Sequence, residues 1–205
     1  MKIPFREIEE ARKDPGAFRI KLEKMQAQSK TPFIPQGYFG QLRNAIYKYH
    51  SSKDPVEGFD YLKLKLSKFN SEYRKQEMEK QYNWYVKDYI EEKRKVFAWR
   101  QNVSVRLNND LIIAGEVNRL DINIDGGYFA WLFLAQKPEM WSQELRMALL
   151  QDRIANSVLH IDACKIIIGV YCFQEQFIDQ HCYSTQEIQE AYAELNKLAL
   201  NLGLI

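Results

Sequence analysis

The sequence predicts an α/β (α+β) domain in which a mixed sheet follows a helical N-terminal region. Three observations predict this fold. Residues 103–134 contain three successive runs with strand character, residues 4–99 repeat apolar side chains at helical spacing, and a helix, two strands and a last helix follow. Strands and helices in this order form a sheet covered by helices. A chain of 205 residues is long enough to bury one sizeable core.

The N-terminal region is expected to consist of helices joined by two loops. Apolar side chains at helical spacing favour helices, and clusters of Pro, Gly, Ser and Asp favour loops. The tripeptide Asp14-Pro15-Gly16 should divide the first helical segment, because proline cannot continue a helix. The expected helices are residues 4–26, 41–50 and 59–99, and the expected loops are residues 30–40 and 51–58.

Three strands are expected next. Residues 103–107 alternate between apolar and polar, which is typical of a half-buried strand, and a second run covers residues 111–124. The Asp-Gly-Gly sequence at 125–127 predicts a tight turn, because glycine tolerates positive φ. Residues 128–134 are apolar throughout and predict a central strand that is buried on both faces. We expect any functional site at the edge of this meander, in residues 115–121.

The C-terminal part is expected to contain a helix, a pair of strands and a final helix. Pro138 precedes an amphipathic helix over residues 140–159. Residues 165–171 predict another central strand, with its partner strand within residues 172–183. The sequence Ser184-Thr185-Gln186-Glu187 matches a capping box, which predicts the start of the last helix.

The composition narrows the class of protein. The chain is 46% hydrophobic and 13% aromatic, as folded domains are. It lacks an apolar run of about 20 residues, the length that a membrane-spanning helix needs, and its first residues lack the apolar segment of a secretory signal. Three cysteines without metal-ligand spacing favour a reduced protein. We therefore expect a cytoplasmic protein with no membrane partner.

The net charge of +2 conceals an asymmetry along the chain. Residues 1–100 carry 22 Lys and Arg against 14 Asp and Glu, and residues 101–205 carry 7 against 13. We expect residues 1–100 to form a helical cap and residues 101–205 to form the core, within one compact domain. A basic cap beside an acidic core suits a cleft that binds a polyanion. The alternative is that the basic helices are simply solvated.

Basic and aromatic side chains are interleaved in residues 59–99. Such a pattern suits nucleic acid, because cations neutralise phosphates and rings stack on bases. Aromatic residues at this spacing also form the buried stripe of an ordinary helix, so both interpretations stay open for them. The candidate phosphate-binding residues are Lys63, Lys65, Lys68, Arg74, Lys75, Lys87, Lys93 and Arg94.

Residues 115–121 read Gly-Glu-Val-Asn-Arg-Leu-Asp and resemble the G-x-[IV]-D-R-[IVL]-D motif of PD-(D/E)XK nucleases, in particular their RecB-like exonuclease branch. In that family the first Asp of the motif binds the metal. Residues 128–134 take the place of the strand that carries the family's D/E-x-K pair, and Gln143 takes the place of its Q-x-x-x-Y motif. Residues 5–22 are similar to the family's opening helix. The resemblance implies a restriction-endonuclease-like fold that acts on DNA.

The sequence departs from the motif where the family keeps its chemistry. Asn118 replaces the first acid, although Arg119 is retained. The third strand has neither an acid nor a lysine, and the nearest lysine is Lys137, just beyond it. Mg²⁺ and Mn²⁺ need anionic oxygen ligands, and a neutral amide is a weak substitute. Met147 stands where the glutamine motif has its Tyr. We therefore expect the scaffold without its catalytic set.

Three functions remain open. The first is a catalytically degenerate domain that binds nucleic acid, or acts as a scaffold, in DNA processing or defence and needs no cofactor. The second is an active DNase whose Mg²⁺ or Mn²⁺ site has moved to Glu116, Asp121 and Glu144. Glu116 and Asp121 would share an ion only if a bulge placed both on one face of the strand. The third is a protein–protein interaction module with an aromatic surface. His50 is either an upstream metal ligand or a residue favoured by a helix C-terminus.

Overall fold

The computed structural model describes residues 2–27, 37–107 and 112–204. In this part of the chain six strands form one mixed sheet in the order β1-β3-β4-β5-β6, and β2 pairs with β3 outside this path. The β1–β3 and β4–β5 pairs are parallel, and the other pairs are antiparallel. The strands are β1 (Lys2–Pro4), β2 (Lys95–Arg106), β3 (Ile112–Ile122), β4 (Tyr128–Leu134), β5 (Ile166–Cys172) and β6 (Phe177–His181).

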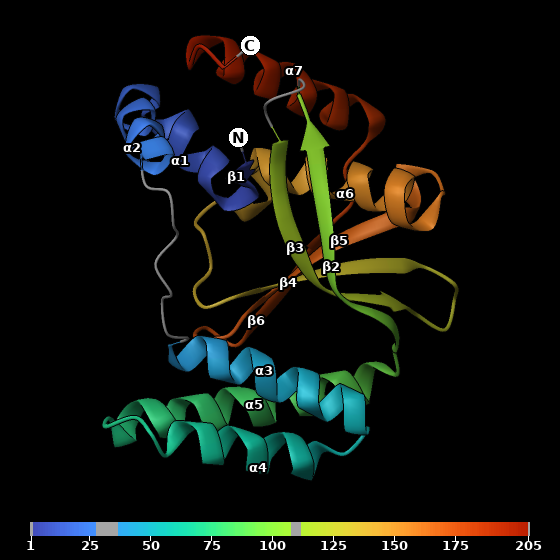
Figure 1. Cartoon of the computed structure of the whole chain (residues 1–205). Coiled ribbons are helices and arrows are strands. Elements are labelled where there is room, and N and C mark those ends of the chain that lie inside the picture. Colours follow the sequence, from blue (N-terminus) through green and yellow to red (C-terminus); the bar gives the residue numbers. More distant parts are fainter. Residues whose placement is uncertain (1, 28–36, 108–111, 205) are drawn as a thin grey trace.

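Helices cover both faces of the sheet, so the molecule has three layers (Figure 1). Helices α1, α2, α6 and α7 pack on one face, and α3, α4 and α5 pack on the other. This arrangement confirms the predicted α/β (α+β) class. The helices are α1 (Ile8–Lys13), α2 (Pro15–Ala27), α3 (Tyr38–Ser52), α4 (Pro55–Leu66), α5 (Glu72–Glu92), α6 (Leu145–Ile154) and α7 (Thr185–Asn201), with short 3₁₀ turns η1 (Phe5–Glu7), η2 (Trp141–Gln143) and η4 (Ala163–Lys165) and a π turn η3 (Ala155–Leu159).

Strand β4 is the buried centre of the sheet, as its unbroken apolar sequence predicts. It lies between β3 and β5, and residues 129–133 are all buried. Ala130 and Leu132 belong to the core that contains α6 and α7, whereas Phe129, Trp131 and Phe133 belong to the core under α3–α5. Because the strand is covered on both sides, every position favours an apolar side chain.

The edge of β3 that faces β4 is left open over a short stretch. Strand β2 occupies the other edge of β3 from Ile112 to Ile122. On the open side, β1 pairs with residues 112–114 and β4 pairs with residues 119–122. Residues 115–118 of β3 therefore lie between two strands that do not meet, and the backbone there faces a gap in the sheet. These residues fall within the segment where the sequence predicts a functional site.

Several predicted boundaries are wrong, and local interactions explain them. Residues 95–99 are in β2 rather than in a helix, because Lys93 adopts a left-handed conformation with φ 51° and ends α5. Helix α4 begins inside the predicted loop 51–58, since the Asp54 side chain accepts a hydrogen bond from the Val56 amide and Pro55 occupies the first turn.

Other differences are smaller. Helix α3 begins at Tyr38, within the predicted loop 30–40, of which residues 30–36 lie outside the described residues. Strand β3 ends at Ile122, and Ile124 in the following turn is 82% exposed. The predicted helix 140–159 is divided into η2, α6 and a π turn. The capping box at Ser184 is present as predicted. No helix in the described ranges is long and apolar enough to cross a membrane.

Gly169 of β5 is a position where only glycine fits. A Cβ there would lie inside the contact distance of the Trp131 ring on the neighbouring strand. Substitution Gly169→Ala should lower the free energy of unfolding by about 2 kcal/mol, because a fully buried ring cannot move aside. Gly16→Ala is the matched control, since its Cβ would meet only the Asp14 side chain at 3.5 Å. Urea unfolding of both variants measures the difference, and equal stabilities would contradict the packing described for β4 and β5.

Candidate functional site

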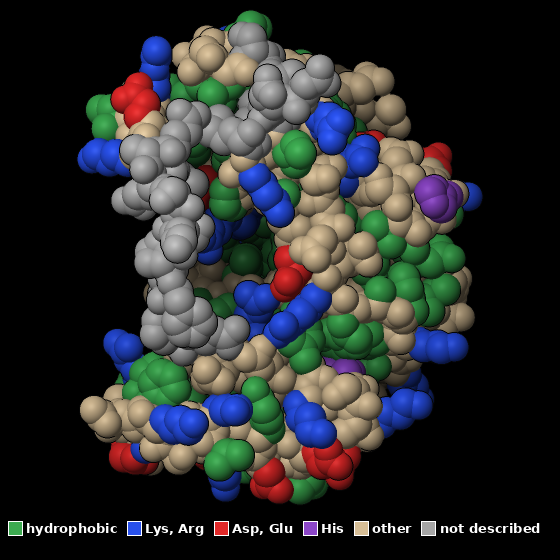
Figure 2. Space-filling view, viewed as in Figure 1, with side chains coloured by type: hydrophobic (Ala, Val, Ile, Leu, Met, Phe, Trp, Pro, Cys, Tyr) green, Lys and Arg blue, Asp and Glu red, His purple; other side chains and the backbone are tan. Residues whose placement is uncertain are grey.

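A cleft of about 440 Å³ opens where β1 and β4 separate along β3. Its walls come from β3, β4, η1, α3 and α6, which are far apart in the sequence. Figure 2 shows a hollow in this region with Lys, Arg and hydrophobic side chains on its walls and an acidic side chain at its rim. The polar side chains that line it are Arg6, Arg43, Glu116, Asn118 and Arg146. Among the described residues, three guanidinium groups and one carboxylate therefore border the cleft.

The carboxylate of Glu116 is paired with an arginine from the helical layer. Arg43 of α3 donates from Nη2 to Glu116 Oε1 at 2.7 Å, and both side chains are about one-third exposed. The Nε of Arg43 is buried and has no hydrogen-bond partner among the described residues. Arg146 of α6 donates from Nε to Glu144 at 2.6 Å. Each guanidinium carries five N–H donors, so both arginines keep donors beyond their ion pairs.

Asn118 holds β3 and β4 together at the point where they separate. Its Oδ1 accepts a hydrogen bond of 2.7 Å from the backbone N–H of Phe133, and its Nδ2 donates to the Tyr47 hydroxyl at 3.2 Å. The last regular pair between the strands is Arg119 with Trp131. The Asn118 side chain thus gives the Phe133 N–H an acceptor at the point where β4 is no longer paired with β3. The position of the motif's metal-binding acid is occupied by a structural amide.

The alternation of side chains along β3 is interrupted next to Asn118. Asn118 contacts Tyr47 of α3, and its neighbour Arg119 contacts Tyr85 of α5, so two consecutive residues face the same helical layer. On the paired strand β2, Arg100 has φ 49° and the register shifts between Val96 and Ala98. Irregularities of this kind redirect side chains. As a result Glu116 and Asp121 both face the α3–α5 layer, which regular alternation would not allow.

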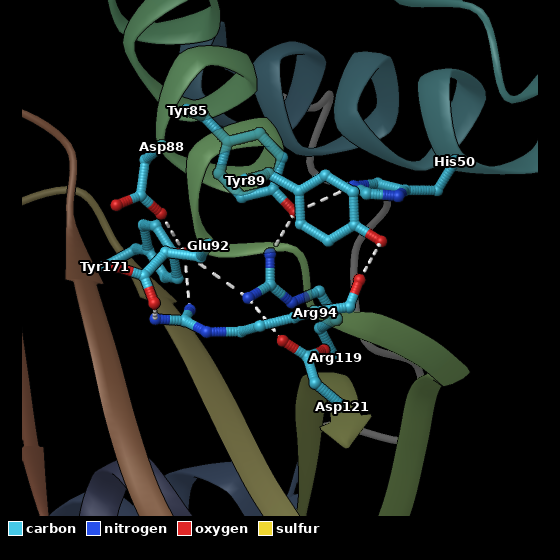
Figure 3. A network of polar contacts seen from close by, with 9 residues as sticks. All are labelled: His50, Tyr85, Asp88, Tyr89, Glu92, Arg94, Arg119, Asp121 and Tyr171. Carbon is cyan, nitrogen blue, oxygen red and sulfur yellow. Dashed lines mark hydrogen bonds and ion pairs between the residues drawn. The ribbon is translucent and has the colours of Figure 1, made fainter. Parts of the chain in front are cut away.

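Arg119 and Asp121 lie inside the core rather than in the cleft (Figure 3). Both side chains are 0% exposed, and Arg119 Nη2 lies 2.6 Å from Asp121 Oδ2. The guanidinium is surrounded by the rings of Tyr85, Tyr89, Trp131 and Tyr171, whose centroids lie 5.1–5.4 Å from its central carbon. Cation–π contacts stabilise a desolvated guanidinium. Burial raises the pKa of Asp121, and the charge of Arg119 opposes this shift.

Hydrogen bonds connect Arg119 with residues of α5 and β5 and, through them, with His50 and Asp88 (Figure 3). Arg119 donates to the Tyr85 hydroxyl at 2.5 Å and to the Tyr171 hydroxyl at 3.3 Å. Because a guanidinium only donates, the Tyr85 proton is free to be donated to Nε2 of His50, 2.9 Å away. Tyr171 in the same way donates to Asp88. Burial, reinforced by the charge of Arg119, lowers the pKa of His50 to about 3, which keeps its ring neutral as this hydrogen bond requires.

The carboxylates of the hypothetical moved metal site do not form one ligand set. Glu116 is paired with Arg43, Asp121 is enclosed with Arg119, and Glu144 is paired with Arg146 at the start of α6. Burial raises the pKa of Glu144. Within the described ranges no group of three or more His, Cys, Asp or Glu side chains could hold a metal ion. The donors present therefore do not suit Mg²⁺ or Mn²⁺, which need several anionic oxygens around one point.

The remaining motif residues lie away from the cleft. The ammonium group of Lys137 lies 3.7 Å from the centroid of the Phe177 ring. Gln143 is in η2, where its carbonyl accepts from Arg12, and it borders a second, acidic cavity of about 220 Å³ with Glu144 and residues of α7. His50 is partly buried and accepts a hydrogen bond from Tyr85, and in the described ranges it belongs to no group of side chains that could hold a metal ion.

The predicted phosphate-binding residues lie in α4 and α5 or just after them, and they do not line the cleft. Lys63 and Lys65 lie over Phe59 and Tyr61, and Arg74 lies over Tyr38. Other members of the set are paired with acids of their own helix: Lys75 with Glu72 and Lys87 with Glu91. Lys68 and Lys93 are exposed. Arg94 has a side chain only 7% exposed, bonded to Glu92 and Tyr171 in the buried network. The aromatic side chains between them largely form the core under the sheet.

Sequence reasoning missed Arg6, Arg43, Arg146 and Tyr47. These residues come from η1, α3 and α6, and no local pattern relates them. The only available signal was their position: Arg43 and Tyr47 lie four residues apart, on one face of a predicted helix.

Comparisons with known proteins give little further information. No protein-family model matches the chain, and no curated protein is detectably similar to it. Among solved structures, one from Eubacterium rectale that is provisionally described as an exonuclease aligns with a TM-score of 0.43 and 11% identity. The alignment covers 89% of this chain and 73% of the other. Similarity this low establishes neither a family nor an activity.

Removing the charge of Asp121 should destabilise the protein strongly. Asp121→Asn leaves the buried Arg119 guanidinium without its anionic partner, and the expected loss is about 3 kcal/mol of unfolding free energy. Glu91→Gln is the control, because it breaks an exposed pair with Lys87 at 3.9 Å and should cost less than about 0.5 kcal/mol. Chemical denaturation measures both. Similar small losses would mean that the buried ion pair does not support the fold.

His50 should make stability depend on pH. In the unfolded chain His50 takes up a proton near its ordinary pKa of 6.5, whereas in the folded state its pKa is about 3. The stabilisation is therefore complete above pH 6.5 and is lost as the pH falls from there. Between about pH 7.5 and about pH 5.5 the wild type should lose about 1 kcal/mol more than His50→Gln, which has no imidazole to titrate. Denaturation at the two pH values measures this, and parallel pH profiles would contradict a neutral buried ring.

Proposed function

We propose that this chain is a catalytically degenerate PD-(D/E)XK-like domain that binds nucleic acid in the cleft between β3, β4, α3 and η1. The observation that carries the proposal is the set of groups around the cleft. Arg6, Arg43 and Arg146 border it, and Asn118 occupies the place of the motif's metal-binding acid. The cleft is thus supplied with donors for anions but is poor in ligands for metals.

Phosphate is the anion that this donor set fits best. A guanidinium is a planar group that binds two oxygens of one phosphate at once. Arg43 has more N–H donors than its pair with Glu116 uses, and the backbone of Gly115 borders the same space without a side chain. Phosphodiester backbones are recognised mainly by such contacts, which position a strand without reading its sequence. This supports binding of nucleic acid as a polyanion.

Hydrolysis is not supported by the same geometry. The side-chain oxygen of Asn118 accepts from Phe133, and the carboxylate of Glu116 neutralises Arg43. Neither group can leave its present role without exposing an unpaired partner. We therefore assign the domain a binding or scaffolding role in DNA processing or defence, and we derive no catalytic step.

Two substitutions in the cleft should change binding in opposite directions. Arg43→Gln removes phosphate donors and should weaken binding of a labelled DNA strand about tenfold at low salt. Glu116→Gln removes the carboxylate that competes for Arg43 and should tighten binding. Fluorescence anisotropy measures both dissociation constants, and the wild-type affinity should fall steeply between about 50 and about 200 mM salt. Lys87→Gln on the outer face of α5 is the matched control, since it removes one exposed charge outside the cleft.

The same DNA, incubated with Mn²⁺, separates the alternatives. Binding without cleavage supports the proposal. Manganese-dependent cleavage that Glu116→Gln abolishes would replace it with an active nuclease whose site has moved. No binding at low salt would overturn it in favour of a protein-interaction module. Equal effects of Arg43→Gln and Lys87→Gln would overturn the assignment of DNA binding to the cleft.

A further inference from the structure

A further cavity, of about 390 Å³, lies where the C-terminal ends of α3 and α5 meet the start of β2. Its lining combines aromatic rings with cations: Tyr49, His50, Tyr89 and Trp99 supply rings, and Lys53, Arg94 and Lys95 supply charge. None of the described residues that line it is acidic. Neither the cleft described above nor the resembled motif includes this cavity, which we call the ring pocket.

The rings of the pocket are held rigidly by one another. His50 lies 4.3 Å from Trp99 and 4.5 Å from Tyr89, measured between ring centroids, and the Tyr89 hydroxyl donates to the Arg94 carbonyl. His50 is fixed in turn by its hydrogen bond with Tyr85. Rigid aromatic walls bind planar rings at little entropic cost, and every nucleobase offers a π-face for such contacts.

Two of the three cations that line the pocket, Lys53 and Lys95, are available to an anion. Lys53 and Lys95 are exposed, whereas Arg94 is bonded to Glu92. A lysine at a helix C-terminus also offsets the partial charge of free carbonyls. At the end of α3 the hydroxyls of Ser51 and Ser52 already donate to the carbonyls of Lys48 and Tyr49. Because serine hydroxyls already bond these carbonyls, the exposed ammonium groups of Lys53 and Lys95 can bind a phosphate instead.

Helix α3 joins the ring pocket to the cleft. Arg43, Tyr47 and His50 are spaced by four and three residues, so they lie along one face of the helix. Tyr47 contacts Trp99 with ring centroids 5.4 Å apart, and the Arg100 guanidinium lies 3.9 Å from the centre of the Tyr47 ring. Arginine and aromatic groups therefore continue without a break from the cleft to the ring pocket.

We propose that the ring pocket binds a nucleotide unit of a single strand, with the base against Trp99 and Tyr89 and the phosphate beside Lys53 and Lys95. This inference rests on the proposed function, because it extends the strand bound in the cleft along α3. It narrows the ligand to a strand with accessible bases. A duplex keeps its bases stacked inside and could use only the cations.

The test compares three ligands of about 15 nucleotides: single-stranded oligothymidylate, an abasic strand with the same number of phosphates, and a duplex. The oligothymidylate should bind the wild-type protein about tenfold more tightly than the abasic strand. Trp99→Leu should reduce this ratio to about one, and Trp99→Phe should restore part of it by returning a ring. Lys53→Gln/Lys95→Gln should weaken oligothymidylate binding more than the control Lys63→Gln/Lys68→Gln, which removes equal charge from α4 and the turn that follows it.

The outcomes separate this inference from the proposal on which it rests. Equal affinity for thymidylate and abasic strands, with Arg43→Gln still weakening both, would overturn the ring pocket and leave the cleft intact. Equal losses in the two lysine pairs would also overturn it, even if Trp99→Leu fails to fold. No binding of any strand at low salt would overturn both. If free thymidine monophosphate binds the ring pocket as tightly as the strand does, the proposed strand is wrong and the ligand is a free nucleotide.

Discussion

The buried guanidinium of Arg119 is the interaction on which the α3–α5 layer depends. A charge with no exposed surface needs an anion and hydrogen-bond acceptors where it lies. Asp121 supplies the anion and the Tyr85 and Tyr171 hydroxyls supply acceptors, while Nε of Arg119 has no hydrogen-bond partner among the described residues. These partners come from β3, α5 and β5, so the requirement fixes the helical layer on the sheet. A shift of α5 would move the Tyr85 hydroxyl away from Arg119 and leave a further buried donor without an acceptor, so the hydrogen bond favours one arrangement of the layer.

The orientation of Arg119 toward the α3–α5 layer is linked to the geometry of the neighbouring cleft. Arg119 and Asn118 face the same layer, and the irregular register of β2 and β3 accompanies this break in alternation. One residue fills the core and the other bridges the separating strands. Glu116, two positions earlier, reaches Arg43 at the cleft. Asn118 and Arg119, in a segment that resembles a metal-binding motif, thus hold neighbouring elements together, and the cations around the cleft come from elements outside this segment.

The sequence predicted the fold class, the central strand and the segment that borders the cleft, because periodicity and turn residues act locally. Residues 115–121 include three residues of the cleft lining: Gly115, Glu116 and Asn118. The surroundings of individual side chains depend on tertiary packing, which the sequence does not reveal. Arg94, predicted to bind phosphate, belongs to the buried network, since charge alone gives no information about burial. Arg43 and Arg146 reach the cleft only through tertiary packing, which no spacing in the sequence reports.

The central claim is that the cleft at the separation of β3 and β4 binds the phosphodiester backbone. The most direct measurement is an NMR titration of the isotopically labelled protein with a short DNA strand. Amide signals of Arg43, Gly115 and Glu116, and of residues 132–134 and Arg146, should shift together and saturate. Shifts confined to the outer faces of α4 and α5, with the signals around β3 unchanged, would contradict the claim.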